Sequence, residues 1–335
     1  MAERIGILGA GSWGMAIAAL LEKNGCEVKL WEFNKDDYEK IRGLRYHPDK
    51  LKEVRLADSI DVTNDLNHAV TDVKWLVLAT PSQFLRSVLV KLKDRKFDGV
   101  GFVNLAKGIE TTTLMRMSEV IEQELSVDPA FVSTLSGPSH AEEVAADLPT
   151  AVVAAGSSGD LIRRIQNLFS NQTFRVYQSD DLIGVELGGS LKNIIAIAAG
   201  ITAGLGMGDN TMGALMTRGL AEMTRLGVTM GAQALTFAGL SGIGDLITTC
   251  SSRHSRNRYV GEHIGRGEKL KDVLASMKMV AEGVQTTRSG FTLAEKYQVE
   301  MPITKEVYEV LFNGKPPAEA VGDLMGRKLK AEIWQ

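Results

Sequence analysis

A lysine lies within an apolar stretch of the chain, "ELGGSLKNIIAIAAG" at residues 186–200. The stretch predicts a buried helix, and an unpaired buried ammonium is costly enough to shift its pKa or to require a partner. Lys192 shares one helix face with small residues, namely Gly188, Gly189, Ala196 and Ala199. These leave room around the charge, as a cleft that admits a substrate requires. The alternative is close helix packing, with Lys192 paired to a structural carboxylate.

Two later segments carry polar groups that suit a phosphorylated ligand. "GIGDLITTC" (242–250) places Asp245 among small and apolar residues, and "SRHSRNR" (252–258) follows it. Guanidinium groups bind phosphate oxygens through paired hydrogen bonds, so the second segment predicts a phosphate site. A solvated basic loop or a weak nucleic-acid patch are the alternatives. The segment has no interleaved aromatic residues and the chain has no wider positive excess, which argues against nucleic acid.

The N-terminal "GAGSWG" places Gly9, Gly11 and Gly14 in a GxGxxG pattern between an expected strand and an expected helix. The first glycine permits a tight turn, the second lets a pyrophosphate approach the backbone, and the third allows close helix–strand packing. Glu32 follows at the end of the next strand, where a carboxylate accepts hydrogen bonds from the adenosine ribose and disfavours a 2′-phosphate. Phe33 can stack on adenine. With no arginine immediately after them, the pattern favours NAD over NADP, unless Glu32 and Phe33 form only a solvated strand end.

Further candidates follow expected strands, where ligands of open α/β sheets bind. Lys107 lies in "NLAKGIE" (104–110) and can hold a substrate oxygen or phosphate, although a surface lysine is the alternative. "SGPSHAEEVA" (136–145) predicts a turn that opens a helix and exposes the N–H groups of Ser139, His140 and Ala141. His140 has no nearby sequence partner, so we interpret it as structural or peripheral.

The elements that must position these residues fall into two groups. Short apolar runs at 4–8, 27–33, 75–80 and 100–105 alternate with helical patterns, and two more strands flank a helix at 160–169, which predicts a doubly wound parallel sheet of the Rossmann type. After about residue 181 only helical periodicity remains. We therefore expect a dinucleotide-binding domain at residues 1–180 and an all-helical substrate domain at 181–335, sharing a long buried helix and a wide interface.

Composition excludes several classes of protein. The 335 residues are 44% hydrophobic and 24% charged, with a formal net charge of −3, which indicates neither a nucleic-acid nor an anionic-membrane partner. The two cysteines, Cys26 and Cys250, form no metal-binding spacing, so no metal is expected and a reduced, cytoplasmic protein is the simplest interpretation. The N-terminus lacks the basic region and cleavage site of a signal peptide. The apolar run after Lys192 is too short to span a membrane.

Several motifs, in this order, resemble the NAD(P)-dependent sn-glycerol-3-phosphate dehydrogenases of bacteria. They are "GAGSWG", "NLAKGIE", "SGPSHAEEVAADLPTAVV", "ELGGSLKNIIAIAAGI", "GLGMGDN", "TRGLAEMTRLG", "GLSGIGDLITTC", "SRNR" and "AEGVQT". The likeness spans nearly the whole chain. It implies an enzyme that interconverts dihydroxyacetone phosphate and sn-glycerol 3-phosphate with a nicotinamide cofactor, for phospholipid synthesis. We also expect a homodimer.

The resemblance also assigns roles to matching residues. Lys192 matches the family's proton acceptor, Lys107 would polarise the reacting oxygen, and Asp245 would orient Lys192 and balance its charge. Together with the residues reasoned above, the expected cofactor-binding positions are Gly9, Gly11, Ser12, Trp13, Gly14, Glu32, Phe33, Lys107, Ala141, Arg256, Val280 and Glu282. The expected substrate-binding positions are Lys107, Gly137, Ser139, Lys192, Asn193, Asp245, Ser255, Arg256 and Asn257.

Two departures from the family pattern stand out. Many bacterial relatives carry an arginine where Phe33 stands, which again favours NAD, and His140 replaces a frequent phenylalanine. Another β-hydroxyacid dehydrogenase is an alternative function, because glycines before a buried lysine–asparagine pair also occur there. A non-catalytic dinucleotide sensor is a further alternative, but it should lack Lys192 or Asp245, and both are present. A partner-binding helical module is another, but such a module does not need the glycine turn of a cofactor site.

Overall fold

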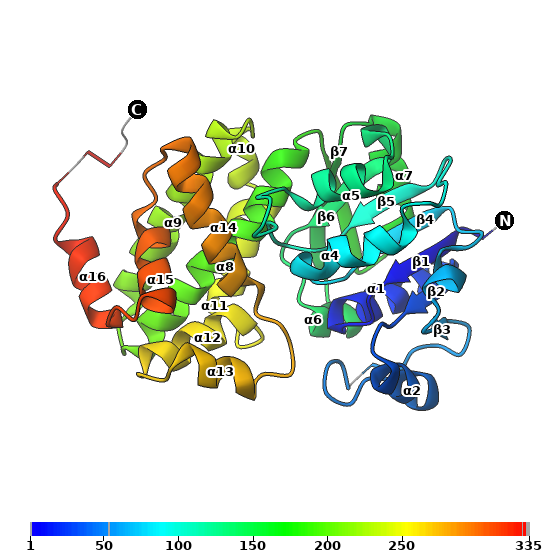
Figure 1. The fold of residues 1–335 in the computed structure, drawn as a ribbon, viewed down its shortest axis with the longest axis horizontal. Coiled ribbons are helices and arrows are strands. Elements are labelled where there is room, and N and C mark those ends of the chain that lie inside the picture. The colour runs from blue at the N-terminus through cyan, green and yellow to red at the C-terminus, as the bar shows by residue number, and fades with distance from the viewer. Residues whose placement is uncertain (1, 53, 330, 333–335) are drawn as a thin grey trace.

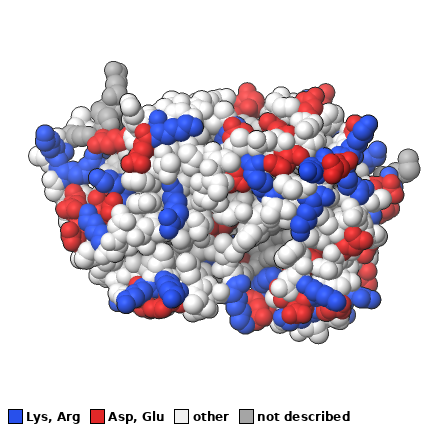
Figure 2. All heavy atoms as spheres, in the orientation of Figure 1, with Lys and Arg blue, Asp and Glu red and all other residues white. Residues whose placement is uncertain are grey.

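The computed structural model describes residues 2–52, 54–329 and 331–332, which form two lobes side by side. Figure 1 shows the N-terminal lobe as a sheet covered by helices and the C-terminal lobe as helices alone. The face drawn in Figure 2 carries positive and negative side chains interspersed, with no large patch of one sign.

The sheet has eight strands in the order β3-β2-β1-β4-β5-β6-β7-β8. Their bounds are β1 Arg4–Leu8, β2 Glu27–Trp31, β3 Asp61–Thr63, β4 Trp75–Leu78, β5 Gly101–Asn104, β6 Val132–Ser136, β7 Thr150–Gly156 and β8 Phe174–Ser179. Strand order reverses beside β1, between β2 and β4. A crevice therefore opens beyond the carboxyl ends of these strands, where ligands of doubly wound sheets bind.

Helices cover both faces of this sheet, as a parallel sheet requires. They are α1 Ser12–Lys23, α2 Lys35–Leu44, α3 Leu66–Val70, α4 Ser82–Leu89, α5 Met117–Leu125, α6 Ala141–Ala145 and α7 Gly159–Phe169, with the short 3₁₀ turns η1 Val90–Leu92 and η2 Pro129–Phe131. One apolar cluster joins the sheet to α1, α6 and α7, and a second joins the opposite face to α3, α4 and α5. The Rossmann-type prediction is confirmed.

The prediction was wrong in one detail of the sheet and incomplete in another. β7 runs antiparallel to β6, whereas the other strand pairs are parallel. Residues 137–149 connect these two strands with only the short α6, and Gly137 starts the reversal at φ +142°, a value that favours glycine. Neither β3 nor β6 was predicted, because β3 is very short and three of the five residues of β6 are Ser or Thr.

The second lobe begins with α8 Leu182–Gly204 and contains no strand within the described residues. Its other helices are α9 Asp209–Thr229, α10 Ala234–Phe237, the π-helical turn η3 Leu240–Gly244, α11 Asp245–Ser251, α12 Arg256–Gly265, α13 Leu270–Ser276, α14 Glu282–Tyr297, α15 Pro302–Phe312 and α16 Pro317–Met325. A third apolar cluster fills the space between them.

Helix α8 belongs to both lobes. It packs on β6 and β7 of the sheet and on α9, α11, α12 and α14 of the helical lobe. Its length and composition would allow it to cross a membrane, but 89% of its most apolar window is buried inside the protein, so it is a core helix. Near its start, buried Glu186 pairs with Arg116 at 2.7 Å and accepts a hydrogen bond from the hydroxyl of Ser118 at 2.6 Å. These contacts fix α8 against α5.

The glycines beside Lys192 do not leave the open space that we expected. A Cβ on Gly188 would lie 2.6 Å from the carbonyl oxygen of Ser241, and one on Gly189 would lie 2.4 Å from the hydroxyl of Ser136. Ala196 and Ala199 are fully buried. The small residues therefore allow close packing of α8 against η3 and β6, which was the alternative interpretation.

We expect Gly188→Ala to lower the free energy of unfolding by about 1–3 kcal/mol, because the added methyl group would overlap a backbone oxygen. The matched control is Gly213→Ala, at an exposed position of α9 where a Cβ meets nothing within 4 Å. It should stabilise the protein by up to about 1 kcal/mol through helix propensity. Urea unfolding measures both, and equal stabilities would contradict the close packing of Gly188.

Candidate active site between the two lobes

A cleft of about 730 Å³ separates the carboxyl end of the sheet from the helical lobe. Most of the predicted residues line it, and they come from the glycine turn, the β2 end, the loops after β5 and β6, and helices α8, α11, α12 and α14. A volume of this size is typical of a small-molecule site. Gly14 and Gly137 are the two predicted residues that are not part of its lining.

The glycine turn has the geometry that dinucleotide binding requires. Gly9 adopts φ +116°, and a Cβ there would lie 2.9 Å from the backbone of Ala79. A Cβ on Gly14 would lie 1.9 Å from the carbonyl oxygen of Gly9, so this glycine allows α1 to approach the strand. A Cβ on Gly11 would meet nothing within 4 Å, and Gly11 is the N-cap of α1. The start of α1 is therefore open to an anion such as a pyrophosphate.

The end of β2 provides an acidic and an aromatic group at the same cleft. Glu32 is mostly buried, and its Oε1 accepts a hydrogen bond from the backbone N–H of Asn34 at 2.9 Å. Phe33 is 68% exposed, and Lys91 Nζ lies 4.9 Å from the centre of its ring. A flat exposed ring beside a carboxylate suits an adenosine.

A charged cluster forms the other end of the cleft. Lys192 Nζ lies 3.1 Å from Asp245 Oδ1, and Lys107 Nζ donates to Asp245 Oδ2 at 2.8 Å. The hydroxyl of Thr249 accepts a further hydrogen bond from Lys192, and the carbonyl oxygen of Gly137 accepts one from Lys107 at 2.8 Å. Gly137 thus positions Lys107 rather than lining the cleft. One carboxylate holds two ammonium groups that face the same space.

Burial controls the charge of this cluster. The pKa of Lys192 is lowered to about 8, mainly because the amine is buried. The Asp245 carboxylate raises this pKa, whereas the ammonium group of Lys107 lowers it further. Burial alone would raise the pKa of Asp245, but the ammonium groups of Lys107 and Lys192 hold it below its usual range. The carboxylate stays ionised, while Lys192 can gain or lose a proton near neutral pH. Such a lysine can act as a general acid or base.

Local structure explains why Asp245 faces α8. It follows the π-helical turn Leu240–Gly244, whose Gly242 lies against the backbone of Phe237. A Cβ on Gly242 would lie 2.0 Å from that residue's carbonyl oxygen. A π turn shifts the phase of a helix and is frequent at functional sites. Here it directs the Asp245 carboxylate toward Lys192.

Two asparagines connect the helices around the cluster. Asn257 donates through Nδ2 to Asn193 Oδ1 at 2.8 Å, and its own Oδ1 accepts from the backbone N–H of Gly283 at 2.9 Å. Asn193 donates to the carbonyl oxygen of Lys107 at 3.3 Å. These bonds join α8, α12 and α14 to the loop after β5, so both side chains are already held in place at the cleft.

The segment 252–258 ends in a helix start that faces the cleft. Ser255 is the N-cap of α12, and its hydroxyl accepts from the backbone N–H of Arg258 at 3.2 Å. Arg256 is the first residue of the helix, and its exposed side chain lines the cleft. A guanidinium beside a helix N-terminus is suited to a phosphate.

Four more predicted residues line the cleft, three of them expected to bind the cofactor and one, Ser139, expected to bind the substrate. Glu282, the first residue of α14, accepts through Oε1 from the backbone N–H of Ser82 at 2.8 Å. Ser139 donates its hydroxyl to the carbonyl oxygen of Gly137 at 2.9 Å, and Ala141 begins α6. Val280 is 42% exposed. The cleft therefore lies between groups from both halves of the chain.

Several residues of the cleft were not predicted from the sequence. Thr249 had only its nearness to Asp245 as a signal. Lys50 and Met279 gave none, because they reach the glycine turn from loops far away in sequence. The hydroxyl of Ser12 donates to the carbonyl oxygen of Lys50 at 2.8 Å and lies 3.4 Å from Met279 Sδ. His254 also lines the cleft, and its ring centre lies 5.9 Å from that of His140.

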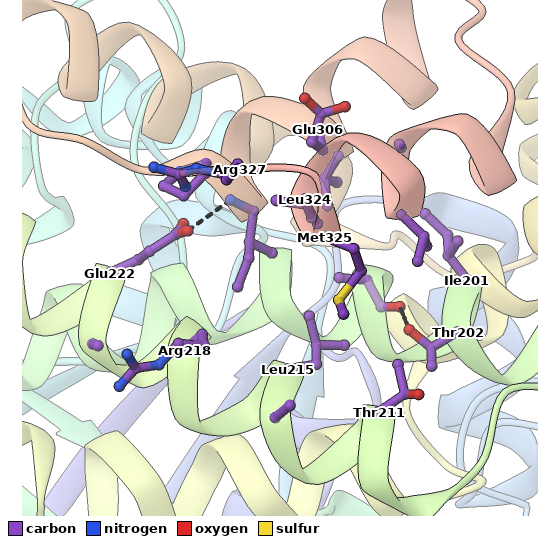
Figure 3. Close-up of a pocket in the computed structure, with 18 of the residues that line it drawn as sticks. Ile201, Thr202, Thr211, Leu215, Arg218, Glu222, Glu306, Leu324, Met325 and Arg327 are labelled. Atoms are coloured by element: carbon purple, nitrogen blue, oxygen red, sulfur yellow. Dashed lines mark hydrogen bonds between the residues drawn. The ribbon is translucent and has the colours of Figure 1, made fainter. Parts of the chain in front are cut away.

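A second cavity of about 350 Å³ lies within the helical lobe, away from the predicted residues. Figure 3 shows Ile201 and Thr202 of α8, Leu215 of α9, and Leu324 and Met325 of α16 around it. Its walls are mainly apolar.

One buried carboxylate borders this second cavity. Burial raises the pKa of Glu222 to about 7, against hydrogen bonds that lower it. Glu222, which is labelled in Figure 3, accepts from the backbone N–H groups of Ile303 at 2.6 Å and Thr304 at 3.1 Å at the start of α15. Its oxygens therefore cap a helix, and we assign it no chemistry.

A glycine turn of this geometry, on a doubly wound sheet facing a buried lysine–aspartate pair, defines a dinucleotide-dependent oxidoreductase. Comparisons with known proteins identify the family. Residues 4–161 match the model of the N-terminal part of NAD-dependent glycerol-3-phosphate dehydrogenase, and residues 181–322 match that of its C-terminal part. The chain belongs to this family, and the resemblance predicted from the motifs is confirmed.

Full-length relatives agree with this assignment. The chain is 51% identical over 335 residues to the glycerol-3-phosphate dehydrogenase [NAD(P)+] of Geobacter sulfurreducens, covering 100% of both chains. It is 52% identical over 330 residues to the glycerol-3-phosphate dehydrogenase [NAD(P)+] of a Thermoanaerobacter species, covering 98% of this chain and 99% of that one. The crystal structure of the glycerol-3-phosphate dehydrogenase of Coxiella burnetii superposes with a TM-score of 0.94 at 36% identity, over 97% of this chain and 99% of that one.

Proposed function

We propose that this chain interconverts dihydroxyacetone phosphate and sn-glycerol 3-phosphate with NAD(P)H. The observation that carries the proposal is the Lys192–Asp245–Lys107 cluster, which faces the same cleft as the open N-terminus of α1. We further propose that residues 1–180 bind the cofactor and that residues 181–335 bind the substrate. The substrate then lies where the two sets of residues meet.

When bound, the nicotinamide cofactor supplies or accepts the hydride. The chain's own residues manage the proton and the position of the substrate. Lys192 donates a proton to the carbonyl oxygen during reduction and removes one from the hydroxyl during oxidation. Lys107 stabilises charge on that oxygen. Asp245 fixes both ammonium groups, which supports their approach to a single atom.

The substrate phosphate lies at the start of α12 in this proposal. Arg256 binds its oxygens, and the helix N-terminus adds a favourable dipole. Ser255 and Asn257 hold that helix start in place. The reacting carbon then faces Lys192.

A substrate panel tests the proposed function. Oxidation of NADH or NADPH is followed by absorbance with dihydroxyacetone phosphate, unphosphorylated dihydroxyacetone and 2-oxo acids in turn. The proposal expects turnover of the phosphorylated ketone far above that of the others. Preference for a 2-oxo acid, or turnover of none of them, would contradict it.

The pKa of Lys192 predicts opposite pH profiles for the two directions. Reduction needs the protonated amine, so its kcat/KM should fall tenfold per pH unit above about 8. Oxidation needs the neutral amine, so its kcat/KM should rise up to about pH 8 and then level off. Asp245→Asn should move both midpoints to lower pH, because the carboxylate raises the pKa of Lys192. Identical midpoints in the wild type and the variant would contradict the coupling.

We also propose a cytoplasmic homodimer whose product supplies phospholipid synthesis. Both cysteines are free, which supports a reducing compartment. The side chains of Met325 and Leu329 are 81% and 101% exposed near the end of the helical lobe, which supports a contact with a second copy. Light scattering coupled to size-exclusion chromatography distinguishes a dimer from a monomer.

A further inference from the structure

His140 belongs to the sheet lobe and lies at the start of α6. Its carbonyl oxygen accepts from the backbone N–H groups of Glu143 at 3.1 Å and Val144 at 3.0 Å, so the helix fixes its backbone. Its side chain lines the cleft, and its ring centre lies 5.9 Å from that of His254 in the helical lobe. His254 directly precedes Ser255, the N-cap of α12. The ring of His140 therefore lies close to the helix start at which we place the substrate phosphate.

The side chain of His140 has a buried nitrogen atom without a partner. Its Nε2 atom makes no hydrogen bond with any described residue, although it is buried from solvent. Within the described chain, Trp13 Nε1 is the one other atom of this kind in the cleft lining, and it belongs to the glycine turn. Buried polar atoms are almost always hydrogen-bonded, because leaving one unpaired costs free energy. We therefore expect a ligand of the cleft to be the partner of His140.

The charges around His140 decide which ligand atom it can meet. Burial lowers the pKa of His140, and the ammonium groups of Lys192 and Lys107 lower it further. The carboxylates of Glu142 and Glu143 raise it, but the net shift is downward from 6.5, so the imidazole is neutral near pH 7. A neutral imidazole carries one N–H group and can donate one hydrogen bond. Beside two ammonium groups, the acceptor for this bond is expected to be an anionic oxygen.

We propose that the Nε2–H group of His140 donates a hydrogen bond to the substrate phosphate, so that both lobes hold this phosphate. The inference rests on the proposed function, because it takes the phosphate to lie at the start of α12. Arg256 binds the phosphate from the helical lobe, and His140 adds a neutral donor from the sheet lobe. The proposal replaces the interpretation of His140 as structural or peripheral, which considered only its neighbours in the sequence.

Nitrogen-15 NMR of the imidazole rings tests the proposal on the unaltered protein. The chain has five histidines, and the resonances of His140 are assigned by their absence from His140→Phe. The full-length protein is titrated with sn-glycerol 3-phosphate in the presence of NADH, a pair that cannot react with each other. We expect the complex to carry a proton on Nε2 of His140 and the ligand to shift the Nε2 resonance. A ring without a proton on Nε2 in the complex, or a resonance that the ligand does not move, would overturn the proposal.

Calorimetry measures what the hydrogen bond contributes to binding. His140→Phe keeps a ring of similar size without a donor, so it should weaken sn-glycerol 3-phosphate about tenfold, as expected for one bond to a charged acceptor. His140→Gln has an amide N–H at a similar reach and should bind within about threefold of the wild type. The affinity for NADH should change by less than about twofold in both variants. No loss in His140→Phe, equal losses in the two variants, or a parallel loss of NADH binding would contradict the proposed bond.

His254 is the matched control, because it is the other imidazole of the pair. It lines the same cleft but is exposed, so solvent can bond to its ring. His254→Phe should change the affinity for sn-glycerol 3-phosphate by less than about threefold. Equal losses in His140→Phe and His254→Phe would show that the two rings act through packing between the lobes, and a specific role for His140 would be wrong.

Kinetics separate this inference from the proposed function. With dihydroxyacetone phosphate, His140→Phe should raise KM about tenfold and change kcat by less than about threefold. The kcat/KM for unphosphorylated dihydroxyacetone should stay within about twofold of the wild type. If the wild type does not reduce dihydroxyacetone phosphate, the proposed function is wrong, and NMR titration with inorganic phosphate still decides the role of His140. An Nε2 resonance that inorganic phosphate leaves unmoved would then overturn the inference as well.

Discussion

Lys192→Met will lower kcat for reduction of dihydroxyacetone phosphate by about 10²–10⁴-fold, the range for loss of a positioned general acid. Methionine has a similar length and is apolar, so it fits a site that is only 6% exposed. Asp245 keeps Lys107 as a partner at 2.8 Å, so its carboxylate is not left without a counter-charge. Stopped-flow measurement of a single turnover isolates the chemical step from product release.

Cofactor affinity provides the internal control for that variant. Lys192 lies at the charged end of the cleft, whereas the glycine turn and Glu32 line the other end. The dissociation constant for NADH should therefore change by less than about threefold. Thr249→Val removes only the hydroxyl that accepts from Lys192, so it should lower kcat far less. A Lys192→Met enzyme that retained more than a tenth of wild-type kcat would contradict the role of this lysine.

Much of the fold follows from local sequence patterns. The strands at 4–8, 75–78 and 150–156 are short apolar runs, the helix at 182–204 is a long apolar run, and the helix at 282–297 has apolar periodicity. β6 was not predicted, because Ser133, Thr134 and Ser136 interrupt its apolar pattern. All three residues are nevertheless buried. The hydroxyls of Ser133 and Thr134 donate to the neighbouring strand β5, to the carbonyl oxygens of Phe102 at 2.7 Å and Asn104 at 3.1 Å. Such tertiary compensation leaves no local signal.

In the candidate site, too, some features could be predicted from the local sequence and others could not. The GxGxxG turn has a local signature, because the positive φ of Gly9 and the contact of Gly14 with the Gly9 carbonyl oxygen both lie within the turn itself. The contact of Lys107 with Asp245 joins residues 138 positions apart, and only the fold brings them together. The role of Gly188 was misjudged for a related reason, since the atom that fills its space belongs to Ser241. Spacing on one helix cannot reveal which other segment packs against it.

Arg256→Ala will raise KM for dihydroxyacetone phosphate on the order of 100-fold, because a guanidinium that makes two charge-assisted hydrogen bonds to phosphate contributes about 3 kcal/mol. Its exposed side chain lines the cleft at the first position of α12, so truncation leaves the core intact. Circular dichroism should show an unchanged melting temperature.

Arg253 is the matched control for this substitution. It lies in the same basic segment and is exposed, but it is not part of the cleft lining. Arg253→Ala should change KM by less than about threefold, as expected for a surface charge.

Unphosphorylated dihydroxyacetone gives the second comparison, because the wild type and Arg256→Ala should turn it over with similar kcat/KM. If Arg256→Ala lowered kcat/KM equally for both ketones, Arg256 would position the cleft or the cofactor rather than recognise phosphate. A selective loss for the phosphorylated ketone instead assigns the start of α12 as the place where the substrate's charge is bound, which in turn directs its carbonyl oxygen toward Lys192.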